Sequence, residues 1–181
     1  MLYCDSFKKD NAVAVPYRDF LDMFSPIKQR DYCAGTARAL RCVESTTAPT
    51  LLEAVNAYGR NKVVAWMMLQ IYNLSEVAGC RDKITDAACE DAATFLVTEY
   101  PYYRVSEIML FFWRCKFGSF GRFYGAVDVQ TLAEWFHKFR GYVNGLLRES
   151  ERHRQGYYRD ECPTSPTNAP CCDFGSRAEG L

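Results

Sequence analysis

The residues best suited to chemistry lie between Glu107 and Asp128, where an apolar run gives way to a loop rich in glycine. Aromatic rings alternate with these glycines, and cationic side chains flank both. Glycine lets backbone amides approach an anion, cations pair with phosphates, and aromatic rings stack on bases. We therefore predict a nucleic-acid or partner-binding loop formed by Arg114, Lys116, Gly118, Phe120, Gly121, Arg122, Phe123, Tyr124 and Gly125.

The loop does not match two familiar phosphate-binding motifs. A P-loop needs a lysine followed by serine or threonine after its last glycine, and a dinucleotide fingerprint needs a preceding strand. Neither condition holds, since the loop has no such pair and follows an apolar helical run. Three interpretations stay open: a tight connection between two helices, a protein contact and a nucleic-acid contact.

Two tyrosines after a proline form a secondary candidate surface. Pro101 should end the helix before it, because the residue that precedes a proline is pushed out of the helical region. Tyr102 and Tyr103 follow directly. They either contact a partner or form the packed corner between two helices.

Patterns typical of catalysis and metal binding are lacking. His137 and His153 stand in no HExxH or comparable arrangement, and there is no serine elbow or catalytic cysteine signature. The cysteines near the C-terminus also lack the spacing of about two to four residues that paired zinc ligands have. These are Cys162, Cys171 and Cys172. We expect no enzymatic activity, no metal and no cofactor.

Helical patterns on both sides must position the loop. Upstream, the run that contains Ile108 and Cys115 is apolar nearly all round, so we expect a buried helix that ends at Gly118. Downstream, Asp128 is a good N-cap for a long amphipathic helix, which we expect to end near Arg154.

Helix-start signals define the elements that come earlier in the chain. Thr50 and Glu53 form a capping box, which predicts a short helix over residues 51–58. A broad apolar stripe predicts a central helix over residues 62–78, and Thr85 caps the helix after it. Before residue 50 we expect one short helix that stops at a proline, followed by a loop over residues 34–49.

These patterns predict an all-α fold. We expect a compact bundle of four to five helices, with the Gly/aromatic/basic loop between the last two and a disordered C-terminal tail. The expected division is an N-terminal extension over residues 1–49, a helical domain over 50–155 and the tail over 156–181.

Composition and charge narrow the class of protein. The formal net charge is zero, which does not indicate general binding to nucleic acid. From Arg104 to Arg154, however, nine basic residues accompany five acidic ones, so we expect the loop on a positive side. The nine cysteines are scattered, no secretory signal is apparent, and no apolar run approaches the ~20 residues of a membrane span. We expect a cytoplasmic protein without membrane contact.

Three stretches are informative as a set: TLLEAVNAYGRNKVVAWMMLQIYNLSEVAG, FLVTEYPYY and SEIMLFFWRCKFGSFGRFYGAVD. Through them, the span from about Thr50 to Glu151 resembles an uncharacterised family of small proteins from Bacteroides-type phages and mobile elements. The resemblance implies an all-helical domain in a mobile-element setting. It implies no activity, because none is assigned to that family.

Two functions follow as hypotheses. The first is a non-enzymatic helical interaction protein of a phage or mobile element, which binds a protein partner through the Gly-rich aromatic loop. The alternative is a DNA-associated accessory factor, related to replication or packaging, that contacts phosphates through the basic loop and the last helix. The oligomeric state stays open.

Overall fold

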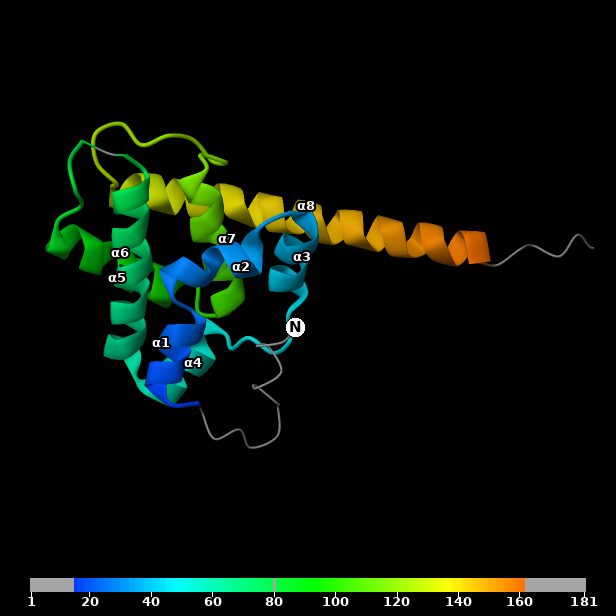
Figure 1. Ribbon diagram of the computed structural model, residues 1–181, viewed down its shortest axis with the longest axis horizontal. Coiled ribbons are helices and arrows are strands. Elements are labelled where there is room, and N and C mark those ends of the chain that lie inside the picture. The colour runs from blue at the N-terminus through cyan, green and yellow to red at the C-terminus, as the bar shows by residue number, and fades with distance from the viewer. Residues whose placement is uncertain (1–14, 80, 162–181) are drawn as a thin grey trace, which may run out of the picture.

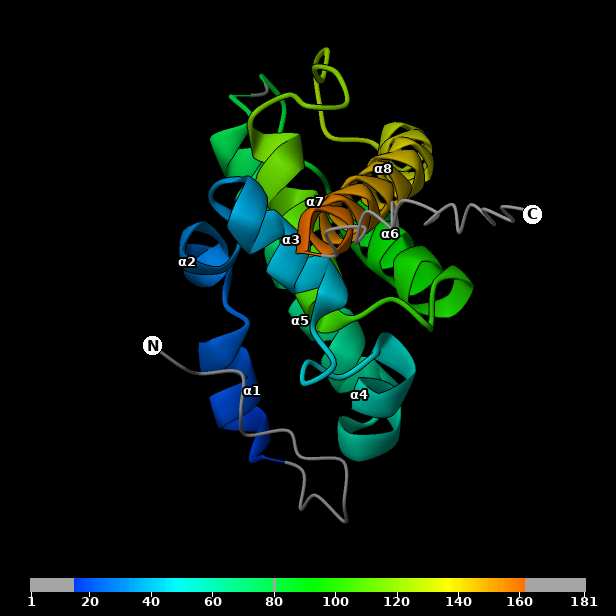
Figure 2. The same ribbon diagram turned by 90° about the vertical axis from the view of Figure 1, so that its right-hand side faces the viewer.

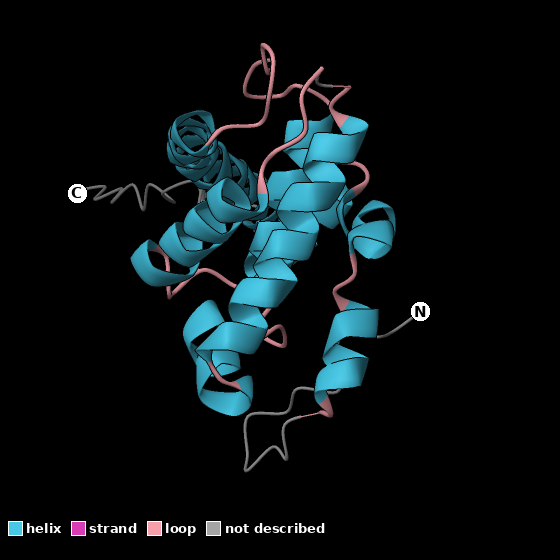
Figure 3. Ribbon diagram, turned by 90° about the vertical axis from the view of Figure 1, so that its left-hand side faces the viewer, coloured by secondary structure: helices cyan, strands magenta, loops and turns pink. Residues whose placement is uncertain are grey.

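The computed structural model describes residues 15–79 and 81–161, and its regular elements there are all helices (Figures 1 and 3). The all-α prediction is confirmed, and the one β-type contact in this part of the chain is an isolated bridge between Thr50 and Arg104. The elements are α1 (Tyr17–Met23), the 3-10 helix η1 (Pro26–Lys28), α2 (Gln29–Cys33), α3 (Thr36–Glu44), α4 (Leu51–Tyr58), α5 (Arg60–Val77), α6 (Asp86–Glu99), α7 (Val105–Lys116) and α8 (Val129–Glu161).

The predicted bundle of four to five helices is too small, because the chain before residue 50 holds three α-helices of its own. The sequence predicts one short helix there and a loop over residues 34–49. In place of that loop stands α3, whose Ala39 and Cys42 lie three positions apart and are buried. Leu40 and Val43 pack against the same core, so the apolar residues of α3 do recur at helical spacing, but this stripe is short and is followed by a stretch rich in serine and threonine.

The predicted helix starts are confirmed by their capping hydrogen bonds. The Thr50 hydroxyl accepts from the Glu53 amide at 3.1 Å, and the Glu53 carboxylate accepts from the Thr50 amide at 2.7 Å. Thr85 accepts from an amide in the first turn of α6, and Asp128 accepts from the Thr131 amide at 2.8 Å. These bonds satisfy amides that a helix start would otherwise leave unpaired.

A single hydrophobic core joins the N-terminal helices to the rest of the described chain. α7 lies in its middle, and the expected burial of this helix is confirmed, since residues from Val105 to Cys115 are mostly inaccessible to solvent. Phe20 of α1 and Phe139 of α8 belong to the same cluster of buried side chains. The N-terminal helices therefore pack into the core of the later helices.

Directional hydrogen bonds fix the N-terminal helices against α5. The Gln29 side-chain amide donates to the Gln70 carbonyl at 2.6 Å, and the Gln70 amide donates to the Phe24 backbone carbonyl at 2.9 Å. The Trp66 indole donates to that same carbonyl at 2.8 Å. Both glutamines are fully buried, so this glutamine network lies inside the core.

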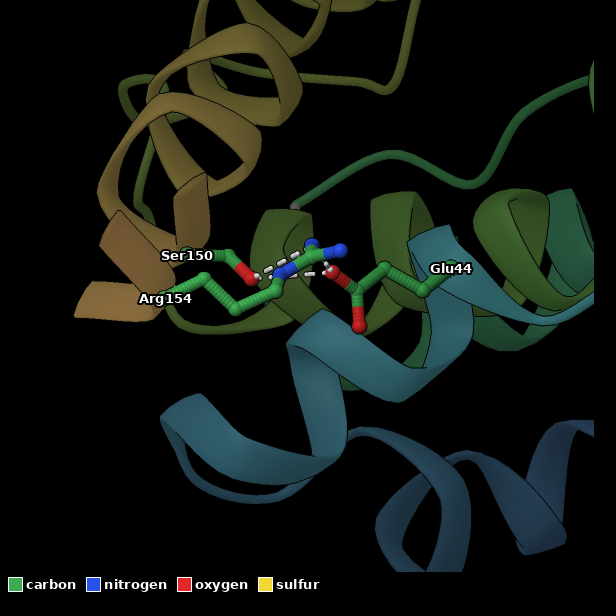
Figure 4. A network of polar contacts seen from close by, with 3 residues as sticks. All are labelled: Glu44, Ser150 and Arg154. Carbon is green, nitrogen blue, oxygen red and sulfur yellow. Dashed lines mark hydrogen bonds and ion pairs between the residues drawn. The ribbon is translucent and has the colours of Figure 1, made fainter. Parts of the chain in front are cut away.

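The last helix, α8, has 33 residues and extends well past the other helices (Figure 1). Its last described side-chain contacts with the body involve Glu44, at the end of α3 (Figure 4). The Glu44 carboxylate accepts from the Ser150 hydroxyl at 2.9 Å and from the Arg154 guanidinium at 3.1 Å. No helix in residues 15–79 and 81–161 combines the length and the apolar character that a membrane span requires.

The predicted start of the tail at Gly156 is wrong, because α8 continues to Glu161. A glycine inside a helix costs only about 1 kcal/mol relative to alanine, and a helix that is already formed adds residues easily. The rest of the predicted tail, with Cys162, Cys171 and Cys172, lies outside the described residues.

Candidate functional site

The predicted binding loop, residues 117–128, joins α7 to α8 at the end of the molecule opposite α1 and α4 (Figures 1 to 3). The connection between α5 and α6 lies beside it, and the Asp82 amide donates to the Gly125 carbonyl at 3.2 Å. The first turn of the loop continues α7, since the Gly118 amide donates to the Cys115 carbonyl at 3.0 Å. Two connections and the start of α8 thus form one end surface.

A cavity of about 390 Å³ opens at this surface. Five of the predicted residues line it, namely Lys116, Gly118, Gly121, Arg122 and Phe123. The rest of the lining comes from Ala78, Cys115, Phe117 and Trp135, which the sequence does not assign to the site. Trp135 lies on the apolar stripe of α8, and that pattern indicates core packing and gives no sign of a role at the site.

Gly121 and Trp135 meet at the wall of the cavity. A Cβ placed on Gly121 would lie 3.3 Å from the Trp135 indole nitrogen, and the backbone φ of Gly121 is 142°. The Phe123 ring packs against the same indole, with ring centroids 4.1 Å apart. Both the backbone conformation and the space therefore favour glycine at position 121.

The three predicted cations differ in how accessible their charged groups are to solvent and to a ligand. The Arg114 guanidinium lies over the Tyr142 ring, 5.0 Å from its centroid, and its buried Nε has no acceptor among the described residues. The Lys116 ammonium donates to the Asn73 side-chain carbonyl, and burial lowers the pKa of this lysine. Arg122 is exposed at the rim of the cavity, so it is the cation that the loop presents to solvent.

The predicted aromatic residues divide in the same way. Phe120 contacts the core, with ring centroids 6.1 Å from both Phe111 and Phe139. Phe123 is half-buried against the indole described above. Tyr124 is 91% exposed, and Phe117, which the sequence does not assign to the site, is 70% exposed. The loop thus presents two large rings to solvent.

The secondary surface around Pro101 is mainly a packed corner. Tyr103 is half-buried, its ring lies 4.9 Å from Phe136, and its carbonyl accepts from the Leu51 amide at 2.9 Å. Tyr102 is 80% exposed. The structure therefore leaves Tyr102 as the solvent-facing member of the predicted pair.

The residues that line the cavity offer groups that can bind a ligand. Its titratable lining residues are Cys115, Lys116 and Arg122, and neither a histidine nor a carboxylate lines it. Burial raises the pKa of Cys115 well above its ordinary value, so this thiol stays protonated. Aromatic faces and one exposed guanidinium suit an apolar or anionic group of a ligand.

Comparison with known proteins gives one match. The model of a family of unknown function (DUF6633) matches residues 83–175, a little over half of the chain. In the described part of the chain this span contains α6, α7, the loop and α8. No curated protein and no solved structure matches the sequence.

Proposed function

Because the chain belongs to DUF6633, a family of unknown function, we propose its function from the end surface: a non-enzymatic helical interaction protein that binds a protein partner through the loop. The observation that carries this proposal is the exposure of Phe117 and Arg122 at a cavity, together with the exposure of Tyr124 in the same loop. The setting we propose, a phage or other mobile element, rests on the family resemblance of residues 50–151.

Residue types at this surface support a protein partner. Aromatic side chains and arginine are enriched among the residues that dominate protein interfaces. Complete burial of one such ring stabilises a complex by about 1.5–3 kcal/mol, so two rings supply about 3–6 kcal/mol. A micromolar complex needs about 8 kcal/mol. The partner must therefore also contact Arg122 or fill the cavity.

The DNA alternative has less support from the geometry. Binding to DNA through phosphates needs several accessible cations, each of which releases counterions. Arg114 and Lys116 are half-buried and engaged by Tyr142 and Asn73, which leaves Arg122 as the accessible cation of the loop. Contacts along α8 would have to supply the remaining phosphates.

Site-specific photo-crosslinking tests the proposal. A benzophenone amino acid replaces Tyr124 in the full-length chain, which is expressed in its native host and irradiated. Ile27 is the matched control, because it is a large apolar side chain outside the loop and the Pro101 corner and is 85% exposed. We expect a discrete protein adduct from position 124, and we expect Arg122→Gln in the same chain to weaken it.

Two results would contradict the proposal. Equal adduct patterns from positions 124 and 27, or none from either, would show that the loop has no protein partner under these conditions. A gel shift with duplex DNA that disappears as salt rises, and that Arg122→Gln weakens, would favour the DNA alternative.

A further inference from the structure

Two cysteines of the N-terminal helices lie in contact, far from the loop in sequence. Cys33 is the last residue of α2 and Cys42 belongs to α3, and their sulfur atoms are 3.8 Å apart. Both are free thiols and both are buried. Such a separation is close to van der Waals contact, so the two sulfurs can react with each other after a small movement.

A second cavity gives the pair a route to solvent. It has a volume of about 470 Å³ and is lined by Cys42 together with Tyr32, Arg38, Arg41 and Ser106, among others. Cys33 does not line it and is completely inaccessible to solvent. A small reagent that enters this cavity therefore meets Cys42 first, with Cys33 directly behind it.

Cations and hydrogen bonds around the pair favour a thiolate on Cys42. Donation from the Cys33 thiol lowers the pKa of Cys42 although burial opposes this, and the Arg41 charge lowers it further. In its neutral form the Cys42 thiol donates a hydrogen bond to the Tyr32 carbonyl, 3.1 Å from the sulfur, and this contact opposes ionisation. The hydrogen bond to Cys42 and burial raise the pKa of Cys33, and the charges of Arg114 and Lys116 oppose that shift only in part, so Cys33 is the protonated member of the pair.

We propose that Cys33 and Cys42 form a redox modification site, at which a hydroperoxide oxidises Cys42 and Cys33 then closes a disulfide. In the first step the Cys42 thiolate attacks the peroxide, the O–O bond breaks, and the products are a sulfenic acid and hydroxide. In the second step the Cys33 thiol displaces the sulfenic oxygen, which leaves as water. The peroxide is the oxidant in this sequence, and the two sulfurs together lose two electrons.

The fold permits the bond to form with little rearrangement. A disulfide has an S–S length of about 2.05 Å, so the sulfurs must approach by about 1.8 Å. α2 and α3 are short and are joined by only two residues, Ala34 and Gly35. Side-chain rotation with a slight shift of α2 against α3 supplies this movement.

Peptide mapping of the full-length protein tests the proposal. The protein is treated with one equivalent of hydrogen peroxide, alkylated and digested with trypsin, which cuts after Arg38 and Arg41 and so separates Cys33 from Cys42. We expect a cross-linked pair of peptides that is lighter than their sum by two hydrogen atoms and disappears on reduction. Cys89, which is buried and contacts no other described cysteine sulfur, is the internal control and should be found alkylated.

Two variants separate the steps. Cys33→Ser should trap Cys42 as a sulfenic acid that reacts with dimedone, whereas Cys42→Ser should leave Cys33 unoxidised. If either variant fails to fold, the mapping of the wild-type chain still decides the question. Alkylation of Cys33 and Cys42 to the same extent as Cys89 after peroxide treatment would overturn the proposal, as would pairing of either cysteine with a different one.

Discussion

The replacement Gly121→Ala adds one Cβ atom at the wall of the loop cavity and so tests how closely the wall is packed there. The added Cβ would lie 3.3 Å from the indole nitrogen of Trp135 and 3.4 Å from Cζ2 of the same ring. Contacts this short are uncommon, so the indole must move by a few tenths of an ångström. Phe123 opposes that movement, because its ring lies against the indole with a centroid distance of 4.1 Å.

Gly125→Ala is the matched control. Gly125 also has a positive φ, 93°, but a Cβ there would meet no atom within 4 Å. Each replacement places alanine in a conformation that costs about 1–3 kcal/mol. Only Gly121→Ala adds the crowding of a packed ring, which typically costs a further 1–3 kcal/mol. We therefore expect Gly121→Ala to lower the free energy of unfolding by about 1 kcal/mol or more beyond the loss from Gly125→Ala.

Thermal and urea unfolding of both variants measure this difference. For a chain of this size, 1 kcal/mol corresponds to a Tm shift of roughly 2–4 °C. The pair Gly121→Ala and Trp135→Leu should also be less destabilising than the sum of the two single changes, because removing the indole removes the crowding. Equal losses from the two glycine replacements, or strict additivity with Trp135→Leu, would refute the contact that we derive for the cavity wall.

Three further predictions test separate parts of the structure. Arg114→Gln should destabilise the fold by about 1–2 kcal/mol in urea titrations, because it removes the stacking on Tyr142, whereas the exposed Arg122→Gln should change stability by less than about 0.5 kcal/mol. Thr50→Ala should cost about 1 kcal/mol by thermal unfolding, since it removes a capping hydrogen bond. Burial raises the pKa of Glu107, although its hydrogen bond to the Arg104 amide opposes the shift, so this ionisation disfavours the folded state. The Tm difference between Glu107→Gln and wild type should therefore shift in the variant's favour as the pH rises above the ordinary glutamate pKa, and a pH-independent difference would contradict this reasoning.

Local signals in the sequence were enough to locate the later helices. Thr50, Thr85 and Asp128 each carry a side chain that can accept a hydrogen bond from an amide in the first turn, and each does so in the structure. The sequence pattern predicts a loop in place of α3, because this helix is short and is followed by Ser45, Thr46 and Thr47, although its apolar residues recur at helical spacing. Its position depends on contacts with α7 and α8, which a local pattern cannot reveal.

Residue types in the sequence are enough to propose the candidate site, but they do not show which of its side chains are exposed to solvent. Arg114 and Tyr142 are 28 positions apart, and Lys116 lies 43 positions from Asn73, so neither contact leaves a local trace in the sequence. Phe117 is not among the predicted site residues, although it directly follows the apolar run of α7. The helix closes at that residue, and the ring is directed to solvent beside Trp113.

The glutamine network gives the N-terminal helices a fixed register. Apolar contacts alone do not fix how far one helix is shifted along another, since many alignments bury a similar apolar area. A slip of one turn, about 5.4 Å, would separate Gln29 from Gln70 and leave their amides unpaired inside the core. Each unpaired group costs about 1–3 kcal/mol, so misaligned states lie well above the native one. The two side-chain amides therefore select one alignment of the N-terminal helices on α5 from several that bury a similar apolar area.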